Sequence, residues 1–158
     1  MKGLVIYESS DILGLITTVI IDGVGLPGGD PFETVEAESK GCEAINFICS
    51  RTFDLIVLTV GYLDDSTEGI EVLRQIKQHP LSRNAETPLV VLLPISQTGR
   101  LREAHEIINS HEPAVGDFVF MSSDGWAVKL IETAINELQK EEARREIHER
   151  SGGDSIEK

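Results

Sequence analysis

Residues 53–80 read FDLIVLTVGYLDDSTEGIEVLRQIKQHP, a segment that combines the two periodicities of an α/β protein. Its first part, residues 54–60, is an almost unbroken apolar run, which predicts a strand buried on both faces. A loop with two aspartates follows. Residues 68–79 then place apolar side chains every three to four positions, as an amphipathic helix does. A strand, a loop and a helix in this order predict one β-α unit.

The same alternation extends in both directions along the chain. Apolar or alternating runs predict strands at residues 3–7, 33–39, 54–60, 88–93 and 117–121. Helical spacing predicts helices at residues 9–22, 41–52, 68–79, 98–110 and 124–149. Strands this apolar need cover on both faces, so the pattern predicts an α/β fold with a doubly wound, five-stranded parallel sheet. Right-handed crossovers then bring the carboxyl ends of the strands to one crevice, where we expect any site.

Length and composition limit the classes of protein. A chain of 158 residues with 41% hydrophobic residues predicts one domain with one core. Its longest apolar runs fall far short of the ~20 residues that a membrane span needs, so we expect a soluble, cytoplasmic protein that does not bind membranes. The formal net charge of −13 and the lack of a basic stripe argue against nucleic acid as a partner.

Three further motifs predict no site. Cys42 and Cys49 are seven residues apart on one helix, too far for a disulfide, and no other metal ligand follows them, so we expect core residues. The GVGLPG segment at 23–28 lacks the helix that a dinucleotide fingerprint needs, and it predicts a flexible loop. His105 and His111 are six positions apart, unlike the histidine pair of a zinc helix, and are expected at the surface.

The central segment FDLIVLTV…EGIEVLRQIKQHPLSRNAETPLVVLLP resembles the centre of a response-regulator receiver domain. The order of elements matches that family over residues 2–139. Gly69 stands where the family's third helix opens, and Thr87-Pro88 precedes the fourth strand as it does in the family. The loop at 61–68 is longer than the family's usual loop. The resemblance implies the flavodoxin-like (βα)5 architecture.

The family's chemistry depends on five positions, and most of them differ here. In receivers, two acidic residues after the first strand hold Mg²⁺, an Asp ending the third strand accepts the phosphoryl group, and the fourth and fifth strands end in Thr or Ser and in Lys. The corresponding residues of this chain are Tyr7, Glu8, Thr59, Leu93 and Met121. An acyl phosphate needs a carboxylate nucleophile and Mg²⁺ prefers several oxygen ligands, so we expect neither metal, nor cofactor, nor phosphoryl transfer at this pocket.

Two alternatives stay open. Asp64 and Asp65 follow the third strand and could form a displaced metal or phosphoryl site, which describes an atypical phosphorylatable response regulator. A small flavodoxin-like enzyme or nucleotide binder could instead use the crevice. The candidate residues of that enzyme are Glu8, Ser9, Ser10 and Asp65. Leu93 and Met121 fill the crevice with apolar volume and no Gly-rich loop follows the first strand, which favours a module without enzymatic activity.

The preferred hypothesis is therefore a stand-alone pseudo-receiver that binds proteins independently of phosphorylation. In the family, the fourth helix, fifth strand and fifth helix form the face for dimers and targets, which implies a signalling protein or a second copy as the partner. Candidate contact residues on that face are Arg100, Arg102, Phe118 and Lys129. Residues 1–139 form the predicted domain, and residues 140–158 a charged helical extension with a flexible tail.

Overall fold

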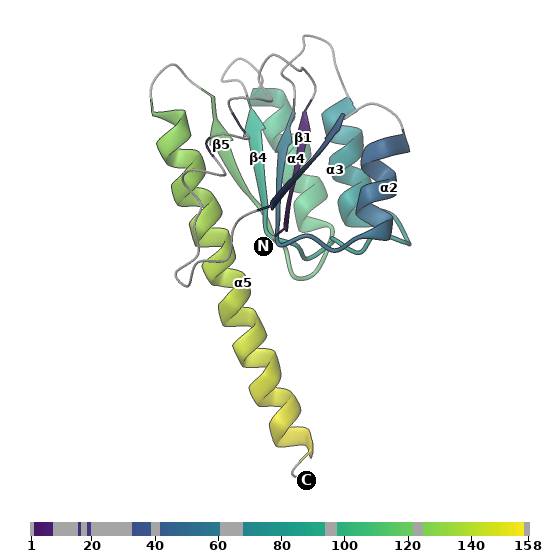
Figure 1. Cartoon of the computed structure of the whole chain (residues 1–158), viewed down its shortest axis with the longest axis vertical. Helices are drawn as coiled ribbons and strands as arrows, with labels where there is room; N and C mark the ends of the chain where they lie inside the picture. Colours follow the sequence, from purple (N-terminus) through teal and green to yellow (C-terminus); the bar gives the residue numbers. More distant parts are fainter. Residues whose placement is uncertain are drawn as a thin grey trace.

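A computed structural model of the chain describes residues 2–7, 16, 19, 33–38, 42–60, 68–93, 98–121 and 125–156. Within these residues, five parallel strands form one sheet in the order β2-β1-β3-β4-β5 (Figure 1). The strands are β1 at Lys2–Tyr7, β2 at Glu33–Glu38, β3 at Leu55–Thr59, β4 at Leu89–Leu93 and β5 at Asp117–Phe120. The strand order reverses at β1, as in flavodoxin-like sheets. The predicted α/β class with a parallel sheet is confirmed.

Helices cover both faces of the sheet. The helices with described bounds are α2 at Cys42–Ser50, α3 at Glu68–Gln78, α4 at Thr98–Asn109 and α5 at Trp126–Ile156. Buried residues of α2, α3 and α4 share one core cluster, whereas those of α5 belong to a second cluster. The helix predicted at 9–22 lies outside the described residues except for Ile16 and Val19, which are helical and pack in the α5 cluster.

The strand sequences explain how one sheet contributes apolar side chains to the core clusters on both of its faces. Successive side chains of a strand point to opposite faces. In β3, Ile56 and Leu58 belong to the α2–α4 cluster, whereas Leu55 and Val57 belong to the α5 cluster. Every residue of β3 and β4 is buried. The continuous apolar runs in the sequence are the direct consequence of this two-sided burial.

Helix α5 has two halves with different surroundings. Its first half follows the predicted apolar stripe, with Leu130 and Ala134 fully buried against the sheet. Its second half, residues 139–156, continues past the docked part, and the C-terminal end of the helix stands clear of the body in Figure 1. We call residues 139–156 the α5 extension. Helical structure continues to Ile156, so it includes residues 151–156 that the sequence predicts as a frayed tail. No helix in the described ranges is long and apolar enough to cross a membrane.

Cys49 differs from its predicted place in the core. It is half-buried and is a free thiol. Its Sγ lies 3.6 Å from Nδ1 of His79, at the start of the loop after α3. The same Nδ1 accepts a hydrogen bond from the backbone N–H of Leu81 at 3.0 Å, so this nitrogen acts as an acceptor. The prediction of a core residue is therefore wrong for Cys49, which is half-buried beside His79.

Candidate functional site

The ends of the strands form the carboxyl edge of the sheet, where the sequence places the candidate pocket. The register pairs Ile6 with Leu58, so Tyr7 and Thr59 end neighbouring strands. Thr59 pairs with Leu92 one strand further. The backbone N–H of Met121 donates to the carbonyl of Leu93 at 2.8 Å, which continues the ladder past the last residue of β5. Tyr7, Thr59 and Leu93 therefore end three strands along this edge, and Met121 directly follows the end of the fourth.

Burial determines the chemistry that these four side chains offer. Thr59 and Leu93 are both 0% exposed, and Tyr7 and Met121 are half-buried. Met121 packs against the apolar cluster beneath α5. A threonine, a leucine, a methionine and a tyrosine provide no carboxylate to accept a phosphoryl group and no ammonium to balance its charge. Of these four side chains, Leu93 and Met121 pack in the apolar clusters on the two faces of the sheet.

Several other predicted candidates cannot be placed. Glu8, Ser9, Ser10, Asp64 and Asp65 lie outside the described residues, and so does the GVGLPG segment. The displaced acidic site and the nucleotide-binding alternative therefore rest on the sequence alone.

The predicted partner face is formed by α4, β5 and α5. The Phe118 ring packs against the core and lies 4.9 Å from the ring of His105 on α4, measured between ring centroids. This aromatic pair joins α4 to β5. Helix α5 packs against β4 and β5. The three elements are therefore contiguous, as the resemblance implies.

The charged residues of this face differ in how far their side chains are exposed to solvent. Arg100, in the first turn of α4, is only 23% exposed at its side chain and pairs with Glu103 of the same helix at 3.3 Å. Arg102 is 89% exposed, with a weak pair to Glu106 at 3.7 Å. Lys129 is exposed in the first turns of α5, next to the exposed Val128. Arg102 and Lys129 are thus more available for a partner than Arg100.

The opposite edge of the sheet, where the strands begin, holds buried polar groups that the sequence did not predict. We call it the amino edge. Asn84 is 0% exposed. Its Oδ1 accepts from the Phe53 N–H and the Thr87 hydroxyl, both at 2.9 Å. Its Nδ2 donates to the carbonyls of Ile48 and Arg51, both at 2.8 Å. One amide thereby ties the end of α2 to the loops that lead into β3 and β4.

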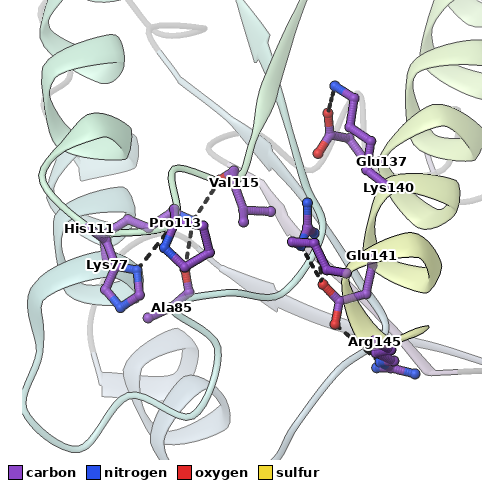
Figure 2. Close-up of polar contacts among 10 residues, drawn as sticks. Lys77, Ala85, His111, Pro113, Val115, Glu137, Lys140, Glu141 and Arg145 are labelled. Atoms are coloured by element: carbon purple, nitrogen blue, oxygen red, sulfur yellow. Dashed lines mark hydrogen bonds and ion pairs between the residues drawn. The ribbon is translucent and has the colours of Figure 1, made fainter. Parts of the chain in front are cut away.

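Lys77 is the second buried polar group at the amino edge. It comes from the last turn of α3 and is 4% exposed. Its Nζ donates to the carbonyl oxygen of Val115 at 2.6 Å and to that of Ala85 at 2.8 Å (Figure 2). Burial lowers the pKa of this amine to about 8, Glu137 and Glu86 oppose that change, and Arg144 adds to it. Lys77 therefore joins the loops before β4 and β5 and is sensitive to charges on α5.

Helix α5 contributes a row of charges to the same edge. The carboxylate of Glu137 is 2% exposed and pairs with Lys140 at 3.0 Å. One turn later, Glu141 accepts from Arg144 at 2.7 Å and from Arg145 at 3.1 Å. Figure 2 shows Lys77 on one side of the Pro113–Val115 loop, and on the other side the α5 residues Glu137, Lys140, Glu141 and Arg145. Charged groups from both faces of the sheet thus meet around one loop.

Two adjoining hollows lie between the α5 extension and the amino edge, with volumes of ≈ 410 Å³ and ≈ 330 Å³. Glu86, Glu141 and Arg145 line both of them. Arg144 and Glu149 line the larger hollow, and Arg83 and His111 the smaller. Since acidic and basic side chains alternate along the walls, this surface is polar with little net charge.

A local signal for the amino edge exists in the sequence. Lys77 follows Ile70 and Leu73 at helical spacing, so it occupies the apolar stripe of α3. Glu137 follows Leu130 and Ala134 in the same way on α5. A charge on an apolar stripe must find a partner when it is buried. The partners, however, come from loops distant in sequence, which periodicity does not reveal.

The sequence matches no protein-family model and no curated protein. Solved structures match its fold. A fusion of the yeast Spc42 trimeric coiled coil, amino acids 181–211, to another protein has a TM-score of 0.65 and 19% identity, covering 99% of this chain and 86% of that one. The N-terminal domain of a response regulator/sensory box/GGDEF 3-domain protein from Carboxydothermus hydrogenoformans has a TM-score of 0.64 and 19% identity, covering 91% of this chain and 98% of that domain.

A response regulator receiver domain from Rhodospirillum rubrum is also similar. Its TM-score is 0.57 at 16% identity, and the match covers 85% of this chain and 91% of that domain. At such identities the likeness establishes a shared fold. The structural neighbours therefore agree with the receiver-type architecture that the sequence resemblance implies, and the chemistry of the edges has to be argued from this chain's own residues.

Proposed function

We propose that this chain is a pseudo-receiver: a receiver-shaped signalling module that binds another protein and accepts no phosphoryl group. The observation that carries the proposal is the state of Thr59 and Leu93, which are both 0% exposed at the ends of β3 and β4. In the receiver resemblance these positions belong to the phosphoacceptor and to the hydroxyl that contacts the phosphoryl group. A buried threonine beside a buried leucine supplies neither role.

The physical argument concerns charge. A transferred phosphoryl group brings negative charge to the crevice, and an active site stabilises it with a metal ion, an ammonium or hydrogen-bond donors. Leu93 and Met121 present apolar atoms where such groups are needed. Placing a charged group against apolar atoms without compensation is strongly unfavourable. The module therefore keeps one conformation rather than switching between two.

The proposed binding face is the surface of α4, β5 and α5. Arg102 and Lys129 supply exposed positive charge, and the His105–Phe118 pair supplies a partly exposed aromatic surface. Aromatic and basic side chains are enriched in protein interfaces. A signalling protein or a second copy of the chain is the proposed partner, and no cofactor takes part.

The direct test is a titration of the ¹⁵N-labelled protein with Mg²⁺ and the phosphoryl mimic beryllofluoride, followed by amide chemical shifts. The proposal expects no saturable shift at Thr59, Val60, Leu93 or Met121. A receiver domain with an intact acidic site, titrated in parallel, is the positive control. Saturable shifts around Thr59 and Asp64 would instead establish a phosphoryl switch with a displaced acceptor.

A further inference from the structure

The hollows beside the α5 extension have walls that buried hydrogen bonds hold in place. Ala85 and Thr87 line the smaller hollow. The Thr87 hydroxyl donates to the Asn84 side chain at 2.9 Å, and the Ala85 carbonyl accepts from the buried amine of Lys77 at 2.8 Å. Walls fixed in this way lose little conformational entropy when a ligand binds. The buried polar groups of the amino edge therefore preorganise a surface that the proposed function leaves unused.

Charged side chains of both signs on these walls have hydrogen-bonding capacity to spare. The exposed Arg83 contacts the Ser50 carbonyl at 3.4 Å, and among the described residues it pairs with no carboxylate. The exposed Glu86 lines the same hollow and, within the described ranges, accepts no hydrogen bond. Arg145 donates from its Nε to Glu141 at 3.1 Å, which leaves the two terminal nitrogens of its guanidinium for a ligand. Opposite charges thus face one hollow without neutralising each other directly.

The two hollows form one elongated groove along α5, which we call the amino-edge groove. They share Glu86, Glu141 and Arg145, and the larger hollow continues to Glu149. Residues 141–149 span ~12 Å along the helix axis. An extended tetrapeptide has a similar length of ~13 Å. An open groove of this length fits a segment of polypeptide better than a compact small molecule.

The charges of the groove favour a partner segment that carries both signs. The whole chain has a formal net charge of −13, so it repels a purely acidic segment. A purely basic segment is attracted to the chain as a whole, but in the groove it meets Arg83 and Arg145. A segment with both kinds of side chain pairs its carboxylate with these guanidinium groups and its cation with Glu86 at the same time.

We propose that the amino-edge groove binds a segment of a partner protein in which acidic and basic side chains alternate. Carboxylates of the segment pair with Arg83 and Arg145, and a cation of the segment pairs with Glu86. The groove is then a second interaction surface, on the edge opposite the candidate pocket. It does not depend on the face formed by α4, β5 and α5.

The test is a titration of the full ¹⁵N-labelled chain with capped tetrapeptides, followed by the side-chain Nε–H signals of the arginines. The probe alternates glutamate and lysine, and two matched peptides contain glutamate alone or lysine alone. We expect saturable shifts of the Arg83 and Arg145 signals with the alternating peptide, at a dissociation constant on the order of 1 mM. Each single-sign peptide should bind at least about fivefold more weakly.

Variants of exposed charges identify the groove residues without disturbing the fold. Arg83→Gln and Glu86→Gln each weaken binding of the alternating peptide by about fivefold, because each removes one ion pair. Arg102→Gln and Glu106→Gln, at side chains 89% and 71% exposed on α4, are the matched controls and leave the binding unchanged.

Three results would overturn the proposal. One is equally tight binding of the lysine peptide, which would mean general attraction to an acidic chain. Another is a titration without saturable shifts, or with shifts that neither groove variant changes. The third is a dimer in sedimentation velocity that Arg83→Gln dissociates, because a second copy of the chain would then occupy the groove.

Discussion

The two edges of this sheet differ in the kind of side chain that they bury. At the carboxyl edge, Thr59 and Leu93 are both fully buried, and Leu93 belongs to the apolar cluster beneath α2–α4. At the amino edge, Asn84, Lys77 and Glu137 are equally buried, but each is held by hydrogen bonds or charge. Open parallel sheets usually place their chemistry at the carboxyl edge. Here the amino edge also holds buried polar groups, so the fold alone does not determine which edge carries the function.

The largest change in the free energy of unfolding is expected from a substitution at the amino edge. Asn84→Ala removes the hydrogen-bond partner of the Phe53 N–H, the Thr87 hydroxyl and the Arg51 carbonyl. The Ile48 carbonyl loses one of its two donors and keeps the Arg83 N–H at 3.1 Å. Each unsatisfied buried group costs about 1–3 kcal/mol, and the effects are not additive, so we expect a loss of roughly 4 kcal/mol in the free energy of unfolding.

Urea unfolding followed by circular dichroism measures this loss. Asn46→Ala removes the same side chain from an exposed position on α2, and we expect a change within about 0.5 kcal/mol. Equal effects of the two variants would show that the Asn84 amide does not organise the amino edge.

The second largest change in the free energy of unfolding is expected at the carboxyl edge. Leu93→Ala removes a fully buried side chain from the end of β4 and leaves a cavity, so we expect a loss of about 3 kcal/mol. Leu81→Ala, at a residue 70% exposed, is the control and is expected to be nearly neutral. The same urea experiment measures both. A loss below about 1 kcal/mol for Leu93→Ala would mean that the carboxyl edge is loosely packed and open to a ligand.

The two edges should also differ in their contribution to the pH dependence of stability. Among the described residues, only the amino edge has a buried cation, Lys77. Burial lowers the pKa of Lys77 from 10.5 to about 8, while the unfolded chain keeps the ordinary value. Between these values the unfolded state binds more protons, so stability rises with pH, by at most on the order of 3 kcal/mol.

Urea unfolding at several pH values between about 8 and about 10 measures this slope in the parent protein and in Lys77→Met. Other groups titrate in both proteins, and the difference between the two slopes isolates Lys77. We expect the slope of the parent to be the more positive of the two. Identical slopes would show that Lys77 keeps an ordinary pKa in the folded state.

The smallest effect on stability is expected at the proposed partner face. The double variant Arg102→Glu and Lys129→Glu alters two exposed side chains, so we expect a change in unfolding free energy within about 0.5 kcal/mol. Binding should respond instead, because a partner that recognises these cations meets two anions. Sedimentation velocity detects any self-association and its loss. A stability loss above 1 kcal/mol would assign these residues a structural role.

Much of the fold was predictable because its signals are local. Strands buried on both faces appear as continuous apolar runs, as in residues 54–60, and the docked half of α5 shows its stripe at helical spacing. The parallel topology then predicts that Tyr7, Thr59, Leu93 and Met121 lie along one edge, and the structure places them there. The roles of these residues in the pocket stay predictions.

The amino edge was not predictable for a physical reason. Lys77 finds the Val115 carbonyl 38 positions away, and Asn84 finds the Ile48 carbonyl 36 positions away. Such contacts depend on three loops meeting after the sheet has formed, and a single sequence contains no local periodicity for them. The charged residues Lys77 and Glu137 on the apolar stripes of α3 and α5 were the one sequence signal that buried polar contacts exist there. This signal does not identify the partners.

The most direct test of the central claim is intact-mass spectrometry of the purified chain after incubation with Mg²⁺ and acetyl phosphate, a small-molecule phosphodonor. A receiver with an intact acidic site serves as the reacting control. The account predicts that this chain keeps its unmodified mass, because the carboxyl edge offers no acceptor at Thr59. A phosphoryl adduct that disappears in Asp64→Asn or Asp65→Asn would contradict it and identify a displaced acceptor.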